Sequence, residues 1–338
     1  MADDERHDVV VVGGGAAGVS GALECFDVQL DVVLLEAGGM LGGQLPEVTN
    51  SIRNVASGRF DDGYTLQRSI SRTASILGDR VRLNQRVESV DFEHLTVDAN
   101  SRRFHARAVL VATGSRRRDL PAAVDGAFAG DVTYQLDAAG AGSGPARFAG
   151  RAVAVIGSGD SATLDALELA ANDSSVVLLH RSSDLTARRD LVARVRAEPR
   201  IEDLAGWELE SVSGAERLQA VVVAQPATGE RRTLSIGGLV VKIGREPCTE
   251  LFRGHLELDR HGAVVVDGRF RTSRRGVFAA GDVVAGAYPR VAVAFGHGVA
   301  AARSILEFVT GGTAWRRGTR RRAAGSRLTR DGAPRPRE

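Results

Sequence analysis

Residues 8–18 read Asp-Val-Val-Val-Val-Gly-Gly-Gly-Ala-Ala-Gly, a short apolar run that leads directly into a glycine-rich turn. The glycines have the spacing GxGxxG, in which the first permits a tight turn, the second lets backbone approach a pyrophosphate, and the third lets helix and strand pack closely. The N–H groups of the helix that follows face the phosphates. The stretch therefore predicts a strand, a turn and a helix that bind a dinucleotide through Gly13, Gly15, Ala16, Ala17 and Gly18.

A second apolar run, Val32 to Leu35, follows the expected helix and ends in Glu36. A carboxylate at this place accepts hydrogen bonds from ribose hydroxyls. A glycine-rich motif alone also fits a plain structural turn. Strand, helix, second strand and terminal acid together favour a nucleotide site.

The same pattern recurs in the middle of the chain. Ala152 to Ile156 form a strand-like run that enters Gly-Ser-Gly-Asp-Ser-Ala and a helix through Ala170. The next expected strand, Val176 to Leu179, ends in His180-Arg181, at the offset that places Glu36 in the first unit. This second site is assigned to Gly157, Gly159, Asp160 and Ser161.

The exchange of an acid for His180-Arg181 predicts NADPH rather than NADH. A carboxylate repels a 2′-phosphate, whereas a guanidinium binds it with paired, charge-assisted hydrogen bonds. Arg188 or Arg189 could add a second contact. Arginines on a solvated face are the alternative, and they fit Arg188 and Arg189 better than Arg181.

Length and composition fit a two-domain, cytoplasmic protein. The chain has 338 residues, of which 43% are hydrophobic and 25% charged, as in ordinary soluble proteins. Its polar start and the lack of a long apolar run predict neither a signal peptide nor a membrane span. The two cysteines, Cys25 and Cys248, exclude a disulfide framework or a cysteine zinc site and fit a reducing compartment. No metal is expected.

The last segment, 313–338, has nine arginines against Asp331 and Glu338. With glycine, proline and serine and almost no apolar periodicity, it is expected to be disordered. An anionic partner such as nucleic acid is the weaker interpretation of this charge. Lys242 is the only lysine, and the chain has 43 arginines. We attribute this imbalance to the composition of the genome rather than to function.

At this point the chain resembles the thioredoxin reductase group of flavoproteins and the similar ferredoxin–NADP reductases. The resemblance covers roughly residues 7–312. Besides the two fingerprints, it is carried by Leu41-Gly42-Gly43-Gln44, Ala112-Thr113-Gly114, Gly244-Arg245-Glu246-Pro247 and Gly276-Val277-Phe278-Ala279-Ala280-Gly281-Asp282.

The resemblance implies an α/β fold of two Rossmann-like domains. Residues 1–118 and 247–312 would form a discontinuous FAD domain, and 119–246 an inserted NADPH domain, each a mostly parallel sheet with helices on its faces. It also implies a homodimer, and hinges near 116–121 and 244–248. The further cofactor-binding residues that it implies are Gly43, Gln44, Val87, Ala112, Thr113, Gly114, Arg245, Gly281, Asp282, Arg290, Val291 and Ala292, with Val87 at adenine and Asp282 at the ribityl chain.

The chain departs from thioredoxin reductases where a redox-active CxxC is expected. In the stretch Val132-Thr133-Tyr134-Gln135-Leu136-Asp137-Ala138, Gln135 and Ala138 occupy the cysteine places. Dithiol–disulfide exchange requires thiolates, so thioredoxin cannot be reduced in the family's way. No catalytic side chain is assigned, because the cofactors carry the hydride.

Three functions stay open from the sequence. The first is a reductase that takes hydride from NADPH onto FAD and passes electrons to ferredoxin, flavodoxin or another small carrier. The second is a reductase of a quinone or small metabolite. The third is a flavin-binding regulatory or interaction protein without turnover. A flavin monooxygenase is disfavoured because the FxGxxxHxxx[YW] signature is missing between the fingerprints.

Overall fold

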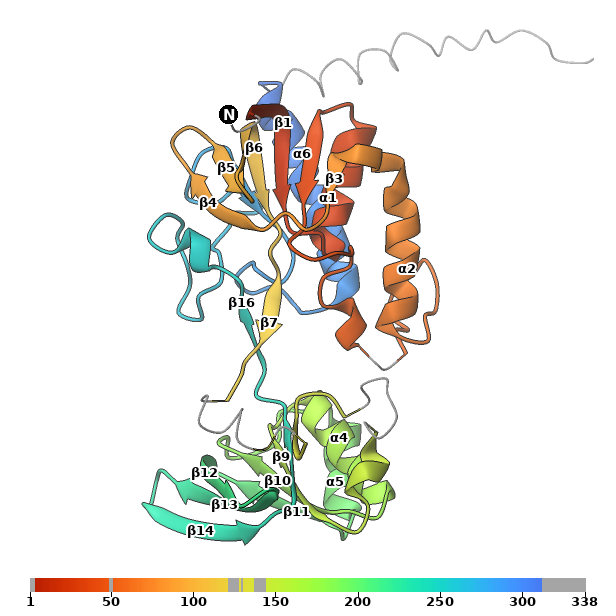
Figure 1. The fold of residues 1–338 in the computed structure, drawn as a ribbon, viewed down its shortest axis with the longest axis vertical. Helices are drawn as coiled ribbons and strands as arrows, with labels where there is room; N and C mark the ends of the chain where they lie inside the picture. The colour runs from red at the N-terminus through yellow and green to blue at the C-terminus, as the bar shows by residue number, and fades with distance from the viewer. Residues whose placement is uncertain (1–3, 49–50, 121–127, 129, 137–143, 312–338) are drawn as a thin grey trace, which may run out of the picture. The chain divides into compact units, whose positions relative to one another are not determined.

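The computed structural model forms two compact units, and the second is inserted into the first. It describes residues 4–48, 51–120, 128, 130–136 and 144–311. Unit 1 combines residues from 1–115 and 247–338, and unit 2 is 116–246 (Figure 1). Ala138 and the arginine-rich segment 313–338 lie outside the described residues.

Unit 1 is built on a sheet with the strand order β3-β2-β1-β6-β5-β4, in which β17 also pairs with β6. The β1, β2, β3, β6 and β17 pairings are parallel, whereas β5 pairs antiparallel with both β4 and β6. The strands are β1 (Asp4–Val12), β2 (Val32–Leu35), β3 (Val81–Arg82), β4 (Val87–Asp91), β5 (Thr96–Ala99), β6 (Arg102–Val111) and β17 (Val277–Ala279).

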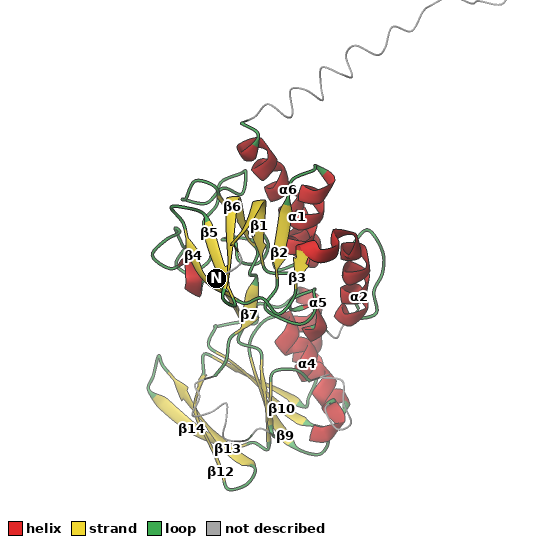
Figure 2. Cartoon of the chain, turned by 45° about the horizontal axis from the view of Figure 1, so that its top comes forward, coloured by secondary structure: helices red, strands yellow, loops and turns green. Residues whose placement is uncertain are grey.

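The two faces of this sheet have different covers. Val9, Val11 and Leu110 belong to a core that they share with helices α1 (Ala16–Asp27), α2 (Gly63–Ala74) and α6 (Val291–Val309). Figure 2 shows these three helices beside the sheet. Their neighbours Val10 and Val12 pack into a second core with β4, β5 and the segment 252–284. Among the described residues, the α-helices lie on one face of this sheet, and β4, β5 and the segment 252–284 together with the 3₁₀ helix Glu250–Phe252 lie on the other.

Unit 2 repeats this arrangement on a smaller scale. Its parallel sheet has the order β11-β10-β9-β15-β8, and a three-stranded antiparallel sheet β12-β13-β14 accompanies it. Helices α4 and α5 share one core with the parallel sheet, and β12–β14 share the other. The elements are β8 (Val132–Thr133), β9 (Ala152–Ile156), α4 (Asp160–Ala171), β10 (Ser175–His180), α5 (Arg189–Ala197), β11 (Ile201–Ala205), β12 (Glu208–Gly214), β13 (Leu218–Gln225), β14 (Glu230–Ser235) and β15 (Gly238–Val241).

The chain passes between the units twice, at residues 115–116 and 246–247. The strands at these crossings, β7 (Ser115–Arg117) and β16 (Arg245–Pro247), pair with each other as a two-stranded sheet. Short 3₁₀ helices complete the description: η1 (Leu45–Glu47), η2 (Ser75–Arg80), η3 (Pro145–Phe148) and η4 (Glu250–Phe252).

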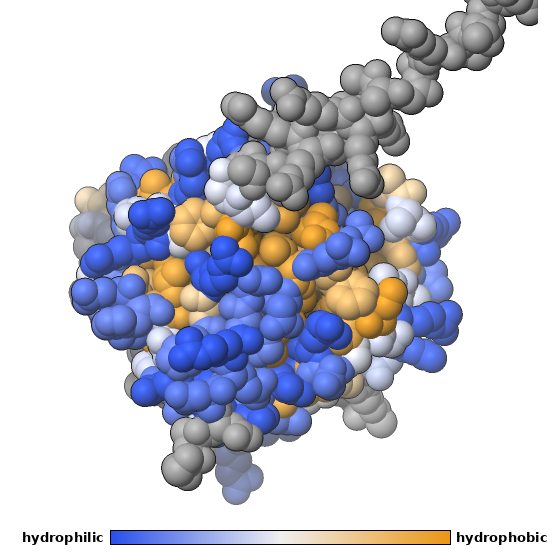
Figure 3. All heavy atoms as spheres, turned by 90° about the horizontal axis from the view of Figure 1, so that it is seen from above, coloured by the Kyte–Doolittle hydropathy of each residue, from blue (hydrophilic) through white to orange (hydrophobic). Residues whose placement is uncertain are grey.

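Helix α6 is long and apolar enough to cross a membrane by length and composition alone. Its buried side chains Ala294, Ala301, Ala302, Ile305 and Val309 belong to the core that it shares with α1. The face in Figure 3 carries polar side chains with apolar patches between them. Large apolar side chains that are exposed in unit 1 include Met40, Tyr64 and Leu83.

Candidate functional site

The first fingerprint has the backbone geometry that a dinucleotide requires. Gly13 has φ of +107°, and a Cβ there would lie 2.4 Å from the carbonyl oxygen of Ala112. A Cβ on Gly18 would lie 1.9 Å from the carbonyl oxygen of Gly13. A Cβ on Gly15 would meet nothing within 4 Å. Gly13 and Gly18 are thus required by close packing, and Gly15 between them faces open space.

Helix α1 begins at this open space and has no side-chain cap. Gly15 is its N-cap and supplies no side-chain hydrogen bond, as is also true of Arg290 at the start of α6. Helix α2, in contrast, is capped by Asp62, which accepts a hydrogen bond from the N–H of Thr65. The first N–H groups of α1 and α6 are therefore left for an anion or a polar ligand.

Glu36 lies beside the fingerprint at the end of β2. Its carboxylate accepts the N–H of Gly14 at 2.6 Å and that of Gly38 at 2.7 Å. The backbone of Glu36 also pairs with residues 82–85, which lead into Val87 on the edge strand β4. The structure thus brings the expected ribose acid close to the segment expected at adenine.

Gln44 and Asp282 meet although they are far apart in the sequence. The amide Nε2 of Gln44 donates to Oδ2 of Asp282 at 2.6 Å, and both lie within 3.4 Å of the Ser115 hydroxyl. Gly281, before Asp282, has φ of +84° and packs against Ala17 of α1. The turn after β2, the loop after β17 and the first helix therefore converge on one site in unit 1.

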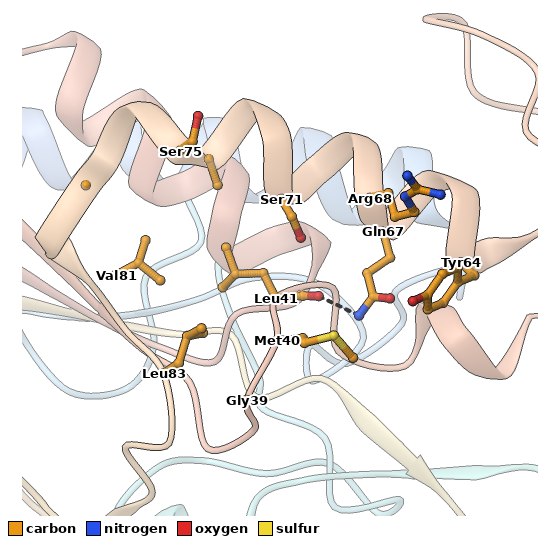
Figure 4. A pocket seen from close by; sticks show the side chains of 12 residues that line it. Gly39, Met40, Leu41, Tyr64, Gln67, Arg68, Ser71, Ser75, Val81 and Leu83 are labelled. Atoms are coloured by element: carbon orange, nitrogen blue, oxygen red, sulfur yellow. Dashed lines mark hydrogen bonds between the residues drawn. The ribbon is translucent and has the colours of Figure 1, made fainter.

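The turn that carries Gly43 is held by Gln67, a residue that the sequence did not reveal. Gln67 of α2 is buried and donates a hydrogen bond to the carbonyl of Leu41 at 2.8 Å (Figure 4). A Cβ on Gly42 would lie 2.5 Å from Cγ of Gln67. One available signal is a glutamine at a core position of an amphipathic helix.

An apolar cavity of about 570 Å³ lies beside this turn, between α2 and the loop after β2 (Figure 4). Met40, Leu41, Tyr64, Val81 and Leu83 line it together with Gln67.

The Ala112-Thr113-Gly114 turn follows β6 and is hydrogen-bonded to the start of the second stretch of unit 1. The hydroxyl of Thr113 donates to the carbonyl of Cys248 at 2.7 Å, and the N–H of Cys248 donates to the carbonyl of Gly114 at 3.0 Å. Arg290 is exposed, and Val291 and Ala292 form the first turn of α6. Arg245 lies on β16, and its carbonyl accepts a hydrogen bond from Arg118.

The second fingerprint, in unit 2, repeats the geometry of the first. Gly157 has φ of +142°, and a Cβ there would lie 2.4 Å from the carbonyl oxygen of Lys242. A Cβ on Gly159 would meet nothing within 4 Å, and Gly159 caps α4 without a side-chain hydrogen bond. Ser161 is exposed. This unit therefore also offers an open helix N-terminus to phosphates.

Asp160 and Arg188 form a hydrogen bond and an ion pair beside the second fingerprint. The carboxylate of Asp160 accepts the backbone N–H of Arg188 at 2.8 Å and lies 3.5 Å from Nε of its guanidinium. The carbonyl of Ser158 accepts the N–H of Thr186 at 2.8 Å. These bonds bring Arg188 to the fingerprint.

His180 and Arg181 point in different directions. The His180 side chain is buried, with Nε2 2.7 Å from Oδ1 of Asp203 and Nδ1 2.9 Å from the carbonyl oxygen of Ser182. Both ring nitrogens are thus used inside unit 2. Arg181 is exposed. The expectation for His180 as a phosphate ligand does not fit this burial, which leaves Arg181 as the cation at the strand end.

The two cysteines both lie in unit 1. Cys25 is buried in α1, as its apolar helical setting indicated, and burial raises the pKa of its thiol to about 12. Cys248 is half-buried near β16. Unit 2 has no cysteine in its sequence. Among the described residues, no cluster of three or more His, Cys, Asp or Glu side chains could hold a metal ion.

With this geometry in place, comparison with known proteins decides the family. The sequence pattern of the pyridine nucleotide-disulphide oxidoreductases matches residues 7–298. The chain belongs to this family. It is an NAD(P)H-dependent oxidoreductase of the thioredoxin reductase type, whose members bind FAD and NADPH.

Individual relatives agree with the family over nearly the whole chain. The chain is 33% identical to a thioredoxin reductase of Mycolicibacterium smegmatis over 87% of its length and 94% of the relative's. It is 24% identical, over 92% of its length and all of the other chain, to a 34.2 kDa protein in the rubredoxin operon of Clostridium pasteurianum. The crystal structure of Lactococcus lactis thioredoxin reductase superposes with a TM-score of 0.77 at 27% identity, and the match covers 90% of this chain and 99% of that one.

Proposed function

We propose that this flavoprotein takes reducing equivalents from NADPH and delivers them to a small electron-carrier protein such as a ferredoxin or flavodoxin. The observation that carries the proposal is the combination of two dinucleotide sites with a second unit that contains no cysteine. The two sites through which NADPH would reduce FAD are present, whereas the dithiol through which thioredoxin reductases pass electrons on is missing. The relative from a rubredoxin operon supports a small redox protein as the partner.

The residues present fit both cofactors. In unit 1, the open space over Gly15, the free N-termini of α1 and α6, Glu36 and the Gln44–Asp282 pair would hold FAD. When bound, FAD accepts a hydride and releases electrons singly or in pairs. In unit 2, Gly159 and the start of α4 would hold the pyrophosphate of NADPH.

Preference for NADPH rests on Arg181, with Arg188 as a second cation. Arg181 is exposed at the end of β10, and Arg188 is fixed at the fingerprint by Asp160. A guanidinium at this place binds a 2′-phosphate with charge-assisted hydrogen bonds. A cytoplasmic location, a homodimer and hinges at the two chain crossings belong to the same proposal.

The test begins with anaerobic mixing of the FAD-loaded protein and NADPH. Rapid bleaching of flavin absorbance is expected, and a flavin that stays oxidised would indicate a binding protein without turnover. Ferredoxins, flavodoxins and quinones are then compared as acceptors, with thioredoxin as the negative control. Faster turnover with quinones than with any carrier protein would contradict the proposed acceptor, and thioredoxin reduction would contradict the missing dithiol argument.

A further inference from the structure

Lys242 is the only lysine in a chain with 43 arginines, and the structure places it beside the second fingerprint. It directly follows β15, and its N–H donates to the carbonyl of Ile156 at 2.7 Å. Its own carbonyl leaves no room for a Cβ on Gly157. Strands β9 and β15 are the neighbours at which the strand order of this sheet reverses, and sheets of this kind bind ligands at that point.

The side chain of Lys242 is held by two oxygens. Its Nζ lies 3.0 Å from Oδ2 of Asp165 on α4 and donates to the carbonyl of Tyr134 at 2.8 Å. The side chains of Lys242 and Asp165 are only 18% and 12% exposed. Burial of such a pair carries a desolvation cost. We therefore expect the pair to position the ammonium rather than to stabilise the fold.

The contact with Tyr134 links Lys242 to the stretch that replaces the dithiol. Tyr134 precedes Gln135, one of the two residues in the cysteine places. Its hydroxyl accepts the N–H of Leu120 at 2.8 Å, and the Arg117 guanidinium lies over its ring at 4.0 Å. The backbone at this point is therefore anchored, and Lys242 is one of its anchors.

We propose that Lys242 binds the nicotinamide half of NADPH. An ammonium has three N–H donors. Tyr134 accepts one of them, the carboxylate of Asp165 lies beside the ammonium, and a further N–H is assigned to an oxygen of the nicotinamide riboside. Strand β10, next to Arg181, and strand β15, next to Lys242, lie on opposite sides of β9. Arg181 is proposed to bind the adenosine half of NADPH, so the nicotinamide half lies toward Lys242. A planar guanidinium does not fit convergent single contacts, so an arginine at this position would not replace the ammonium. This inference rests on the proposed function.

The test compares two nucleotides on the FAD-loaded full chain. NADP⁺ has the nicotinamide half, and 2′,5′-ADP lacks it but shares the adenosine and the 2′-phosphate. In Lys242→Met, the dissociation constant for NADP⁺, measured by calorimetry, is expected to rise about tenfold to a hundredfold, as for loss of one charge-assisted hydrogen bond. The constant for 2′,5′-ADP is expected to stay within about twofold of the wild-type value.

Two further variants keep the test decisive. Lys242→Met removes the ammonium beside the buried Asp165 carboxylate and could unfold unit 2, so Lys242→Met/Asp165→Asn removes both charges and is measured in the same way. Lys242→Arg keeps the charge and is expected to restore less than a tenth of the lost NADP⁺ affinity.

Equal weakening of both nucleotides, or unchanged binding of NADP⁺, in a folded variant overturns the assignment of Lys242. A wild-type flavin that NADPH does not bleach overturns the proposed function instead, so the two failures are distinguishable.

Discussion

Glu36 and His180 end equivalent strands of the two units, yet their side chains have different roles. Glu36 stays half-buried at the surface and binds the N–H groups of Gly14 and Gly38. His180 turns inward and bridges Asp203 and the Ser182 carbonyl. The sequence offset alone gives the position of a strand end, and the direction of the side chain depends on which partners the neighbouring strands supply.

Arg181→Ala is expected to lower the preference for NADPH over NADH by about tenfold to a hundredfold, because it removes a guanidinium from the proposed 2′-phosphate site. The measurement is the ratio of kcat/KM values for flavin reduction with the two nucleotides. His180→Ala is the contrasting variant. It is expected to lower the free energy of unfolding by about 1–3 kcal/mol, since Asp203 loses a buried partner, and to leave the nucleotide ratio unchanged. A change of the ratio in His180→Ala alone would reverse the assignment.

Gln67→Leu is expected to weaken FAD binding about tenfold, because the Leu41 carbonyl loses its buried donor and the turn that carries Gln44 loosens. The measurement is the FAD dissociation constant of the reconstituted apoprotein. Arg72→Leu, which changes an exposed residue on the same helix that does not line the cavity, is the control and should bind FAD as the wild type does.

At the scale of elements, helices α1 and α6 are packed so closely that glycine is required at their contact. A Cβ on Gly298 would lie 2.1 Å from the carbonyl oxygen of Ala17. Gly296, two residues earlier on α6, is exposed, and a Cβ there would meet nothing within 4 Å. The same substitution is therefore expected to act in opposite directions at the two positions.

Gly298→Ala is expected to lower the free energy of unfolding by about 2 kcal/mol or more, because the helices must separate. Gly296→Ala is expected to raise it by about 0.5–1 kcal/mol, because alanine loses less backbone entropy in a helix. Urea unfolding of the FAD-loaded protein measures both. Equal effects of the two variants would show that α1 and α6 adjust without strain.

Asp131 connects the parallel sheet of unit 2 to its antiparallel sheet. Its carboxylate is buried and accepts hydrogen bonds from Arg217, Arg151 and the N–H of Leu218. The Arg217 hydrogen bonds, aided by the N–H of Leu218 and the charge of Arg151, lower the pKa of Asp131 from 3.8 to about 2. A lowered pKa stabilises the folded state at pH values above the unfolded pKa.

This stabilisation, about 2 kcal/mol, is expected to disappear as the pH falls from about 4 to 2. Asp131→Asn should accordingly be less stable than the wild type at pH 7, and the difference should shrink through this pH range. Urea midpoints at pH 7, 4 and 2.5 test this. A difference that is constant with pH would mean that the carboxylate charge is not the source of the stability.

Much of the fold follows from the sequence, because unbroken apolar runs mark strands that are buried on both faces. The runs at 32–35 and 152–156 coincide with β2 and β9. Strand β1 begins four residues before the expected start, since the charged residues Asp4–His7 pair with β6 and Glu5 forms an ion pair with Arg102. An apolar run requires a cover on each face but does not specify helix or sheet, so β12–β14 were not predicted.

Within the sites, the glycines were predictable because their spacing has a steric cause. Gln67, Lys242 and Asp131 were not, since each acts through partners that are distant in the sequence.

At the scale of the whole molecule, each unit has its own sheets and its own pair of apolar cores. The two fingerprints lie in different units. Removal of FAD is therefore expected to change the affinity of the protein for 2′,5′-ADP by less than about threefold. Calorimetry on the apoprotein and the FAD-loaded protein tests this, and a tenfold loss in the apoprotein would mean that the nucleotide site of unit 2 depends on the flavin.

The paired strands β7 and β16 have a consequence for the architecture of the chain as a polymer. Because they are hydrogen-bonded neighbours, they hold the two ends of the insert 116–246 together where the chain leaves and re-enters unit 1. The entropy of closing a loop grows only with the logarithm of its length. Unit 1 could therefore exchange this insert for one of another size, or for a tight turn, at little cost to its own folding.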